Sequence, residues 1–325
     1  MELQTERDAS ACDHCHACRK RCEFLDTHGI DVGDIKRFRA LAYHCFLCGA
    51  CARVCPHGID GRRIALEERR RRTKAHGDAL DECGFGLLLA EKSPYAFANH
   101  RNATPGSVLF PGCSFTARYP RTTRVLAQTL HEVAGMGTVY DCCGKPVFEL
   151  GLEDRSQRDA HALANRLEAR GVTELVTVCP NCQAHLAPRL PIPVTNVYDK
   201  LADLGLGRVV STVQEVFPPC PDREHRTWFE SLQRFMEGEV RLMDAPTCCG
   251  LGGCAFVKEP SLARSMAQEV AQRTEGTVHT YCASCTGVLR KGGANAVHIL
   301  PAILGVDEQP AGAKSLFNRA LAKFR

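Results

Sequence analysis

The regular spacing of the first eight cysteines constrains this chain more than any other feature. Four of them follow the pattern C-x2-C-x2-C-x3-C, and the same pattern returns once more, where Pro56 follows it. A short loop of this kind can wrap three thiolates around three corners of one metal cluster, while the fourth thiolate points away. The two blocks are Cys12, Cys15, Cys18 and Cys22, followed by Cys45, Cys48, Cys51 and Cys55.

This spacing is typical of bacterial ferredoxins, in which the fourth cysteine of one block binds the other cluster. It predicts two cubane [4Fe–4S] clusters. Zinc is the alternative, but zinc sites favour C-x2-C pairs separated by a longer loop. Glu23 stands where ferredoxins usually carry a proline, which affects the turn after Cys22 and not the spacing. The predicted ligand sets are Cys12, Cys15, Cys18 and Cys55 for one cluster, and Cys45, Cys48, Cys51 and Cys22 for the other.

The composition argues against a secreted, disulfide-stapled scaffold. The chain has 20 cysteines in 325 residues, and disulfide-rich secreted domains are far shorter. Its first ten residues lack the pattern of a signal peptide, and its longest apolar patch, 84–90, is too short to span a membrane. We therefore expect a cytoplasmic protein, with any membrane association through a partner subunit. A net charge of +4 is too small to indicate a nucleic-acid partner.

A second cysteine pattern begins beyond residue 100 and occurs twice. Each copy has a single cysteine, then a Cys-Cys-Gly triplet, then a C-x2-C pair. Five matched positions in the same order, with nearly constant offsets, predict a duplicated domain. The first set is Cys113, Cys142, Cys143, Cys179 and Cys182, and the second is Cys220, Cys248, Cys249, Cys282 and Cys285.

The adjacent cysteines in each triplet indicate the type of metal group. Neighbouring side chains diverge, so two adjacent thiolates suit a polynuclear cluster better than a single ion. Five thiolates also exceed the four that a zinc or cubane site takes. Buried structural cysteines or a redox disulfide are the alternatives.

The segments between the cysteines predict local structure. In the first copy we expect strands at 108–110 and 173–178 and helices at 121–134 and 158–170; in the second, strands at 213–217, 239–243 and 277–281 and helices at 225–236 and 262–273. This alternation predicts a small parallel α/β layer in each copy, with cysteines at the carboxyl ends of strands and each C-x2-C pair opening a helix. Helices are also expected at 35–42 and 59–76. The basic face of the latter is either solvated or a docking surface for an acidic electron-transfer partner.

The repeated C…CCG…C-x-x-C pattern resembles the cysteine-rich CCG domains of the heterodisulfide reductase catalytic subunit. The N-terminal part resembles the ferredoxin-like partner subunit, and the two are joined here as in the fused, membrane-complex type of that enzyme. The resemblance implies an α/β chain with a helical dicluster ferredoxin-like domain at 1–100 and CCG domains at 101–208 and 209–325. It also implies that each five-cysteine set binds a noncubane [4Fe–4S] cluster and that the two clusters flank the site of disulfide cleavage.

The function implied by this resemblance is an oxidoreductase subunit that passes electrons through the cubane pair to the noncubane pair. No G-x-G-x-x-G fingerprint follows a strand, so we expect no flavin or nicotinamide in this chain. The electron donor would be a partner subunit, either a flavoprotein or a membrane quinol-oxidising cytochrome, and the substrate a disulfide or other small molecule. The alternative is a non-catalytic electron-transfer subunit of a glycolate-, lactate- or glycerol-3-phosphate-oxidising or quinone-linked complex.

The remaining candidates have simpler interpretations. Cys83 and Cys254 are expected to be packed, inert thiols. The residues beside the second pattern, Lys145, His185, Arg290 and Lys291, are most simply solvated; otherwise they would raise the potential of a cluster or hold an anionic substrate. We expect the histidines beside the cubane ligands, His14, His16, His44 and His57, to be exposed or to orient ligands.

Overall fold

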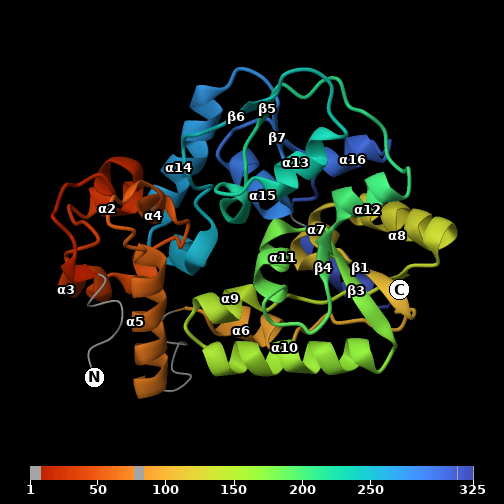
Figure 1. Ribbon diagram of the computed structural model, residues 1–325, viewed down its shortest axis with the longest axis horizontal. Helices are drawn as coiled ribbons and strands as arrows, with labels where there is room; N and C mark the ends of the chain where they lie inside the picture. The colour runs from red at the N-terminus through yellow and green to blue at the C-terminus, as the bar shows by residue number, and fades with distance from the viewer. Residues whose placement is uncertain (1–8, 77–83, 313, 325) are drawn as a thin grey trace.

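Two parallel sheets form the larger part of the molecule. The computed structural model describes residues 9–76, 84–312 and 314–324, so Cys83 lies outside the described residues. The N-terminal helical part lies at the left of Figure 1, with one sheet above its centre and the other to the right. None of the helices within the described ranges is long and apolar enough to cross a membrane.

The first sheet has the strand order β2-β1-β3-β4, and all its pairs are parallel. The predicted strands and helices are present, with ends shifted by one to five residues. The short strands β2 and β4 and the helix α12 are additions that the sequence pattern did not indicate. The elements are β1 (Gly106–Phe110), α7 (Gly112–Arg118), α8 (Pro120–Ala134), β2 (Gly137–Thr138), α9 (Lys145–Glu149), α10 (Glu153–Glu168), β3 (Val172–Thr177), α11 (Pro180–Leu186), β4 (Val194–Asn196) and α12 (Val197–Asp203).

The second sheet repeats this arrangement in the order β6-β5-β7-β8, again with parallel pairs. Its strands are shorter than expected, with only two residues each in β5 and β6. The expectation of a parallel α/β layer in each copy is confirmed. The elements are β5 (Glu215–Val216), α13 (Thr227–Gln233), β6 (Arg241–Leu242), α14 (Pro260–Arg273), β7 (Val278–Thr280), α15 (Ala283–Lys291), β8 (Ala296–His298) and α16 (Ile299–Ile303), with short 3-10 turns η4 (Cys220–Asp222) and η5 (Gly252–Val257).

The N-terminal part consists of short helices and loops around its cysteines. Helix α3 ends two residues earlier than expected, whereas α5 covers nearly all of the predicted 59–76. The final helix, α17 (Ser315–Lys323), returns to the first sheet, where Asn318 donates a hydrogen bond to the carbonyl oxygen of Ala117 at 2.8 Å. The remaining elements are η1 (Arg19–Arg21), α2 (Glu23–Thr27), α3 (Ile35–Ala40), η2 (Ala42–His44), α4 (Ala50–Val54), α5 (Gly61–His76) and α6 (Gly86–Lys92).

Apolar side chains join these parts through several buried clusters. Tyr198 from the first copy packs with Trp228 and Tyr281 from the second copy. The N-terminal part contributes Phe46 to a cluster that also contains Met266 of α14. The burial of these aromatic surfaces accounts for much of the attraction between the parts.

The basic face expected on helix α5 is only partly solvated. Arg71 is exposed and pairs with Glu68, but Arg69 is fully buried, so the solvated interpretation is wrong for this residue. Arg69 uses all five of its N–H donors on main-chain carbonyl oxygens at 2.5–3.0 Å. The acceptors belong to all three parts of the chain: Ala42 and Cys45, Glu149, and Gly253.

Replacing Arg69 with methionine should therefore lower the free energy of unfolding by about 3 kcal/mol or more, because several buried carbonyl oxygens lose their donor and each costs roughly 1–3 kcal/mol. Chemical denaturation of the holoprotein, followed by circular dichroism, measures the change. Lys74→Met, at an exposed position on the same helix, is the matched control and should change stability by less than about 0.5 kcal/mol. Equal effects of the two substitutions would contradict this role of Arg69.

Candidate metal centres

The first predicted cubane set lies together at the surface of the N-terminal part. Cys12, Cys15, Cys18 and Cys55 line one small cavity, although Cys55 comes from the second sequence block. Cys15 is exposed, and Cys12 and Cys55 are half-buried. This set is therefore accessible from solvent.

The second predicted set is more deeply buried. The side chains of Cys22, Cys45, Cys48 and Cys51 are all buried. Burial raises the pKa of the Cys22 thiol, and the nearby sulfurs of Cys48, Cys51 and Cys45 raise it further. The structure thus brings Cys22 to the second block and Cys55 to the first, which is the crossed grouping that the spacing predicts.

Carboxylates hold the histidines that neighbour these cysteines. Buried Asp31 accepts a hydrogen bond from Nδ1 of His14 at 2.9 Å, and His16 lies 3.1 Å from the same carboxylate. His57 lies 3.2 Å from Asp13. These contacts fix the loops around the first set.

A second histidine group links the N-terminal part to the second copy. His28 and His44 both lie 2.6 Å from Oε1 of Glu259, which precedes α14. Although burial disfavours the charge of Glu259, these hydrogen bonds lower the pKa of its carboxyl group. The pair of contacts holds η2, and with it Cys45, against α14.

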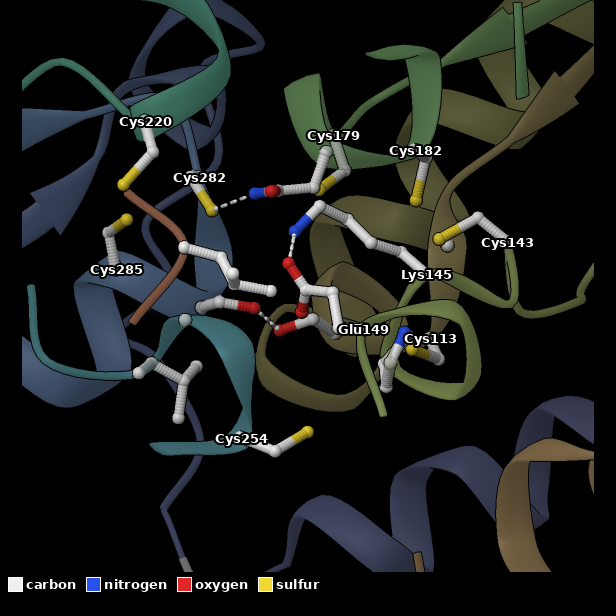
Figure 2. A pocket seen from close by; sticks show the side chains of 18 of the residues that line it. Cys113, Cys143, Lys145, Glu149, Cys179, Cys182, Cys220, Cys254, Cys282 and Cys285 are labelled. Atoms are coloured by element: carbon white, nitrogen blue, oxygen red, sulfur yellow. Dashed lines mark hydrogen bonds and ion pairs between the residues drawn. The ribbon is translucent and has the colours of Figure 1, made fainter. Parts of the chain in front are cut away.

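The two sets of the repeated pattern face a common cavity. Nine of their ten cysteines line a volume of about 330 Å³ between the two sheets. Figure 2 shows the labelled second-set cysteines on the left and the labelled first-set cysteines on the right. The exception is Cys248, whose thiol donates a hydrogen bond to Cys48 and lowers the pKa of that residue to about 7. Cys248 therefore connects the second set with the buried N-terminal set.

Equivalent cysteines have equivalent surroundings in the two copies. Cys142 lies beside Cys113, with 3.8 Å between their sulfurs, as Cys248 lies beside Cys220. Cys249 lies beside Cys285, with 3.7 Å between their sulfurs, as Cys143 lies beside Cys182. Hydrogen bonds from Cys142 and Cys182 hold the pKa of Cys143 well below its usual range. Those from Cys248 and Cys285 do the same for Cys249. The second cysteine of each triplet is therefore the one that favours the thiolate.

The C-x2-C pairs open helices, as the sequence predicts: Cys179 precedes α11 and Cys282 precedes α15. Hydrogen bonds from Cys179 and Cys285, together with backbone amides, hold the pKa of Cys282 well below normal. The pKa of Cys179 is raised instead, because its thiol donates to Cys282 and is buried. The pKa is thus lowered at Cys282 and raised at Cys179, although each of these residues directly precedes a helix.

The same two helices reach across the boundary between the copies. Asn181 Nδ2 donates to Cys282 Sγ at 3.7 Å, and Ser284 Oγ donates to Ser114 Oγ at 2.8 Å. Sequence reasoning did not identify these residues as part of the site. Their position in the sequence could have indicated their role, because Asn181 and Ser284 each stand directly before the last cysteine of a set.

Lys145 lies in the cavity, so its interpretation as a solvated residue is wrong. It forms an ion pair with Glu149, and both residues line the cavity. Although burial disfavours the ammonium ion, Glu149 and the nearby Cys220 and Cys143 raise the pKa of Lys145. In Figure 2 the ion pair lies between the two groups of cysteines.

His185 is also buried and not solvated. Burial, with Arg189 and Lys145 nearby, lowers its pKa to about 3, so it is neutral at physiological pH. The two basic residues after the second C-x2-C pair, Arg290 and Lys291, are both exposed, and Arg290 donates to the carbonyl oxygen of Ala296 at 3.3 Å.

Cys254 lines the cavity without being part of either set. Its side chain is 5% exposed, and burial raises the pKa of its thiol to about 12. A thiol with this pKa stays protonated, in agreement with the expectation of a packed thiol.

A glycine follows each cysteine pair because the backbone turns sharply there. Gly144 and Gly250 have φ values of 80° and 83°, in the left-handed region. A Cβ atom on Gly250 would also lie 2.4 Å from the carbonyl oxygen of Ala263, whereas one on Gly144 would meet no atom closer than 3.7 Å.

Gly250→Ala should thus destabilise the second copy by about 2 kcal/mol or more, from backbone strain and overlap with α14. Gly144→Ala should cost less, because only the strain applies. Thermal unfolding and iron content of the holoprotein measure both effects, with Gly276→Ala, which meets no atom within 4 Å, as the control. A stable Gly250→Ala variant with full iron content would contradict the prediction.

Comparison with known proteins agrees with this geometry. Residues 107–187 and 215–290 both match the family model described as a cysteine-rich domain, CCG. The chain therefore carries the cysteine-rich CCG domain twice, and each match contains one complete five-cysteine set.

Similarity to whole proteins extends beyond these two segments. The chain is 27% identical over 286 residues to a subunit of the fumarate reductase (CoM/CoB) of Methanothermobacter marburgensis, which covers 75% of this chain and 55% of that protein. It is 24% identical over 288 residues to a subunit of the dihydromethanophenazine:CoB–CoM heterodisulfide reductase of Methanosarcina acetivorans, covering 74% of this chain and 69% of that protein. The chain thus spans little more than half of the first relative.

Similarity to solved structures is weak. A glutamate racemase from Bacillus anthracis aligns with 63% of this chain and 80% of its own at 11% sequence identity. Its TM-score of 0.32 is too low to indicate a shared fold.

Proposed function

We propose that this chain is an iron–sulfur protein of heterodisulfide reductase type that reduces a disulfide in the cavity between its two CCG domains. The observation that carries the proposal is the convergence of nine cysteines, from two complete sets, on one cavity. A protein that only relays electrons needs no cavity at the end of its path. The relatives' names describe parts of reductases, and this agrees with the proposal.

The arrangement of thiols fits iron–sulfur clusters. Soft thiolate ligands favour them, and eighteen cysteines lie in four groups. Two cubane clusters would be held by Cys12, Cys15, Cys18 and Cys55 and by Cys22, Cys45, Cys48 and Cys51; two noncubane clusters would be held by Cys113, Cys142, Cys143, Cys179 and Cys182 and by Cys220, Cys248, Cys249, Cys282 and Cys285. When bound, such clusters supply one-electron transfer, and two electrons with two protons convert a disulfide into two thiols.

The burial of the cysteine groups gives the electron path a direction. The first group, with exposed Cys15, is the one that a donor protein can approach. The second group is buried, and its Cys48 contacts Cys248 of the second CCG domain. Electrons from a flavoprotein or membrane cytochrome partner would enter at the first group and leave at the cavity.

The remaining cavity residues suit a disulfide substrate. The Lys145 ammonium group, held by Glu149, would stabilise a thiolate as the S–S bond opens, since a charge-assisted hydrogen bond is strong in a buried site. Apolar Leu88, Leu251 and Phe256 line the cavity and exclude water. A neighbouring cavity of about 450 Å³ shares Lys145 and Glu149 with it and provides an approach route.

The metal content tests the ligand sets. Anaerobically purified protein should contain about sixteen iron and sixteen sulfide per chain if all four clusters are present. Cys143→Ser should remove about four of each while sparing the cubane signals. Cys254→Ser in the same cavity is the matched control and should keep the full content. About eight iron in the unmodified protein would contradict the noncubane assignment.

Catalysis is tested with the same variants. With chemically reduced viologen as donor, the holoprotein should consume a disulfide and release two thiols per two electrons. Cys143→Ser and Cys249→Ser should lower the rate at least about a hundredfold, because each set delivers one electron to the bond. Lys145→Met should lower the rate roughly tenfold or more, as expected for a lost charge-assisted hydrogen bond. Electron uptake without thiol release would favour the alternative of an electron relay.

A further inference from the structure

A second, strongly basic cavity lies outside the cysteine cavity, between the N-terminal part and the second CCG domain. Its volume is about 190 Å³. Four arginines and one carboxylate line it, so the ionisable groups at its wall carry four positive charges and one negative. The charged lining residues are Arg21, Arg53, Arg223, Arg226 and Asp244.

Main-chain carbonyl oxygens hold three of these arginines in place. Arg21 donates to Asp244 at 2.9 Å, and Arg53 donates to Cys48 at 3.1 Å. Arg223 donates to Met243 at 3.1 Å and to Pro246 at 3.2 Å. Within the described ranges, none of the four arginines forms an ion pair with a carboxylate. Four positive charges therefore face one another across the cavity, with only Asp244 at its wall and Glu23 nearby as neighbouring carboxylates among the described residues.

Buried polar atoms in this cavity have no hydrogen-bond partner among the described residues. They are Nη2 of Arg53, Nε of Arg223 and the hydroxyl of Thr247. Thr247 is only 2% exposed and lines the cavity. A buried donor without an acceptor is costly, and three of them in one small volume call for a shared acceptor.

We propose that this cavity binds a small phosphate-type anion, for which Arg53, Arg223 and Thr247 supply the buried donors. A tetrahedral dianion offers several acceptor oxygens and negative charge to pair with the guanidinium groups, whose planar donors match its geometry. Arg226, at the exposed edge of the cavity, adds a further charge. The site is separate from the cysteine cavity and does not depend on the proposed reaction.

The anion would also join two parts of the chain. Arg21 and Arg53 belong to the N-terminal part, directly beside or near its cysteines, while Arg223, Arg226 and Thr247 belong to the second CCG domain. Like charges that meet across a boundary repel each other, and a dianion between them removes this repulsion. Binding should therefore hold the N-terminal part against the contact of Cys48 with Cys248.

Calorimetric titration of the holoprotein with inorganic phosphate, in chloride buffer of matched ionic strength, tests the site. Saturable binding of one phosphate per chain is expected. Arg226→Gln should weaken it about tenfold and Thr247→Val about threefold to tenfold, in line with the loss of one hydrogen bond or charge. Thr247→Ser keeps the hydroxyl and should stay within about twofold of the unmodified protein. Arg234→Gln, which follows α13 and lies outside the cavity, is the matched control and should also bind normally.

Phosphate should also raise the thermal midpoint of the holoprotein but not that of Arg226→Gln at the same concentration, because a ligand of the native state stabilises it by mass action. The proposal is overturned if phosphate shows no saturable binding, if acetate binds as tightly as phosphate, or if Arg234→Gln weakens binding as much as Arg226→Gln. Disulfide reduction is not used as a readout, so failure here leaves the proposed function untouched.

Discussion

The buried guanidinium group of Arg69 is the interaction on which the relative placement of the three parts depends. Its five donors reach carbonyl oxygens of Ala42, Cys45, Glu149 and Gly253. Two of these residues belong to the site itself, because Cys45 is in the buried N-terminal group and Glu149 holds Lys145. Only arginine has enough donors in a fixed fork to satisfy so many acceptors at once. One side chain thus connects the buried N-terminal cysteine group with the wall of the cavity.

Around Arg69, the contacts between the parts place the cysteine groups in a spatial order that runs from the surface to the cavity. The carboxylate of Glu259 contacts the rings of His28 and His44. The thiol of Cys248 donates a hydrogen bond to Cys48. The first N-terminal group includes exposed Cys15, whereas all four cysteines of the second group are buried. Such an order suits an electron path, because an exposed group can meet a partner while a buried group protects the chemistry from solvent.

Local patterns in the sequence were sufficient for much of this arrangement. The crossed grouping of Cys22 and Cys55 follows from spacing alone, since a loop holds three thiolates and turns the fourth away. The long helices were predictable because their apolar periodicity is strong, whereas β2 and β4 are too short to show any period. The placement of Arg69, Lys145 and His185 away from open solvent was not predictable, because it arises where segments distant in sequence meet. A basic residue in a charged helix has the same local pattern whether it faces water or a set of carbonyl oxygens.

The symmetry between the two CCG domains is incomplete, and the difference has a physical basis. The two sets match in their thiolate positions, Cys143 and Cys249. In the described part of the chain, Cys248 of the second copy forms a hydrogen bond with a cysteine of the N-terminal part, Cys48. In the first copy the equivalent Cys142 faces Cys113 and lines the cavity. Lys145 follows the first triplet, while Leu251 occupies the equivalent place after the second. The repeated fold therefore supplies two similar thiol sets with different neighbours. Under the proposed function, the second copy would receive electrons through Cys248, and the first would present the charge of Lys145 to the substrate.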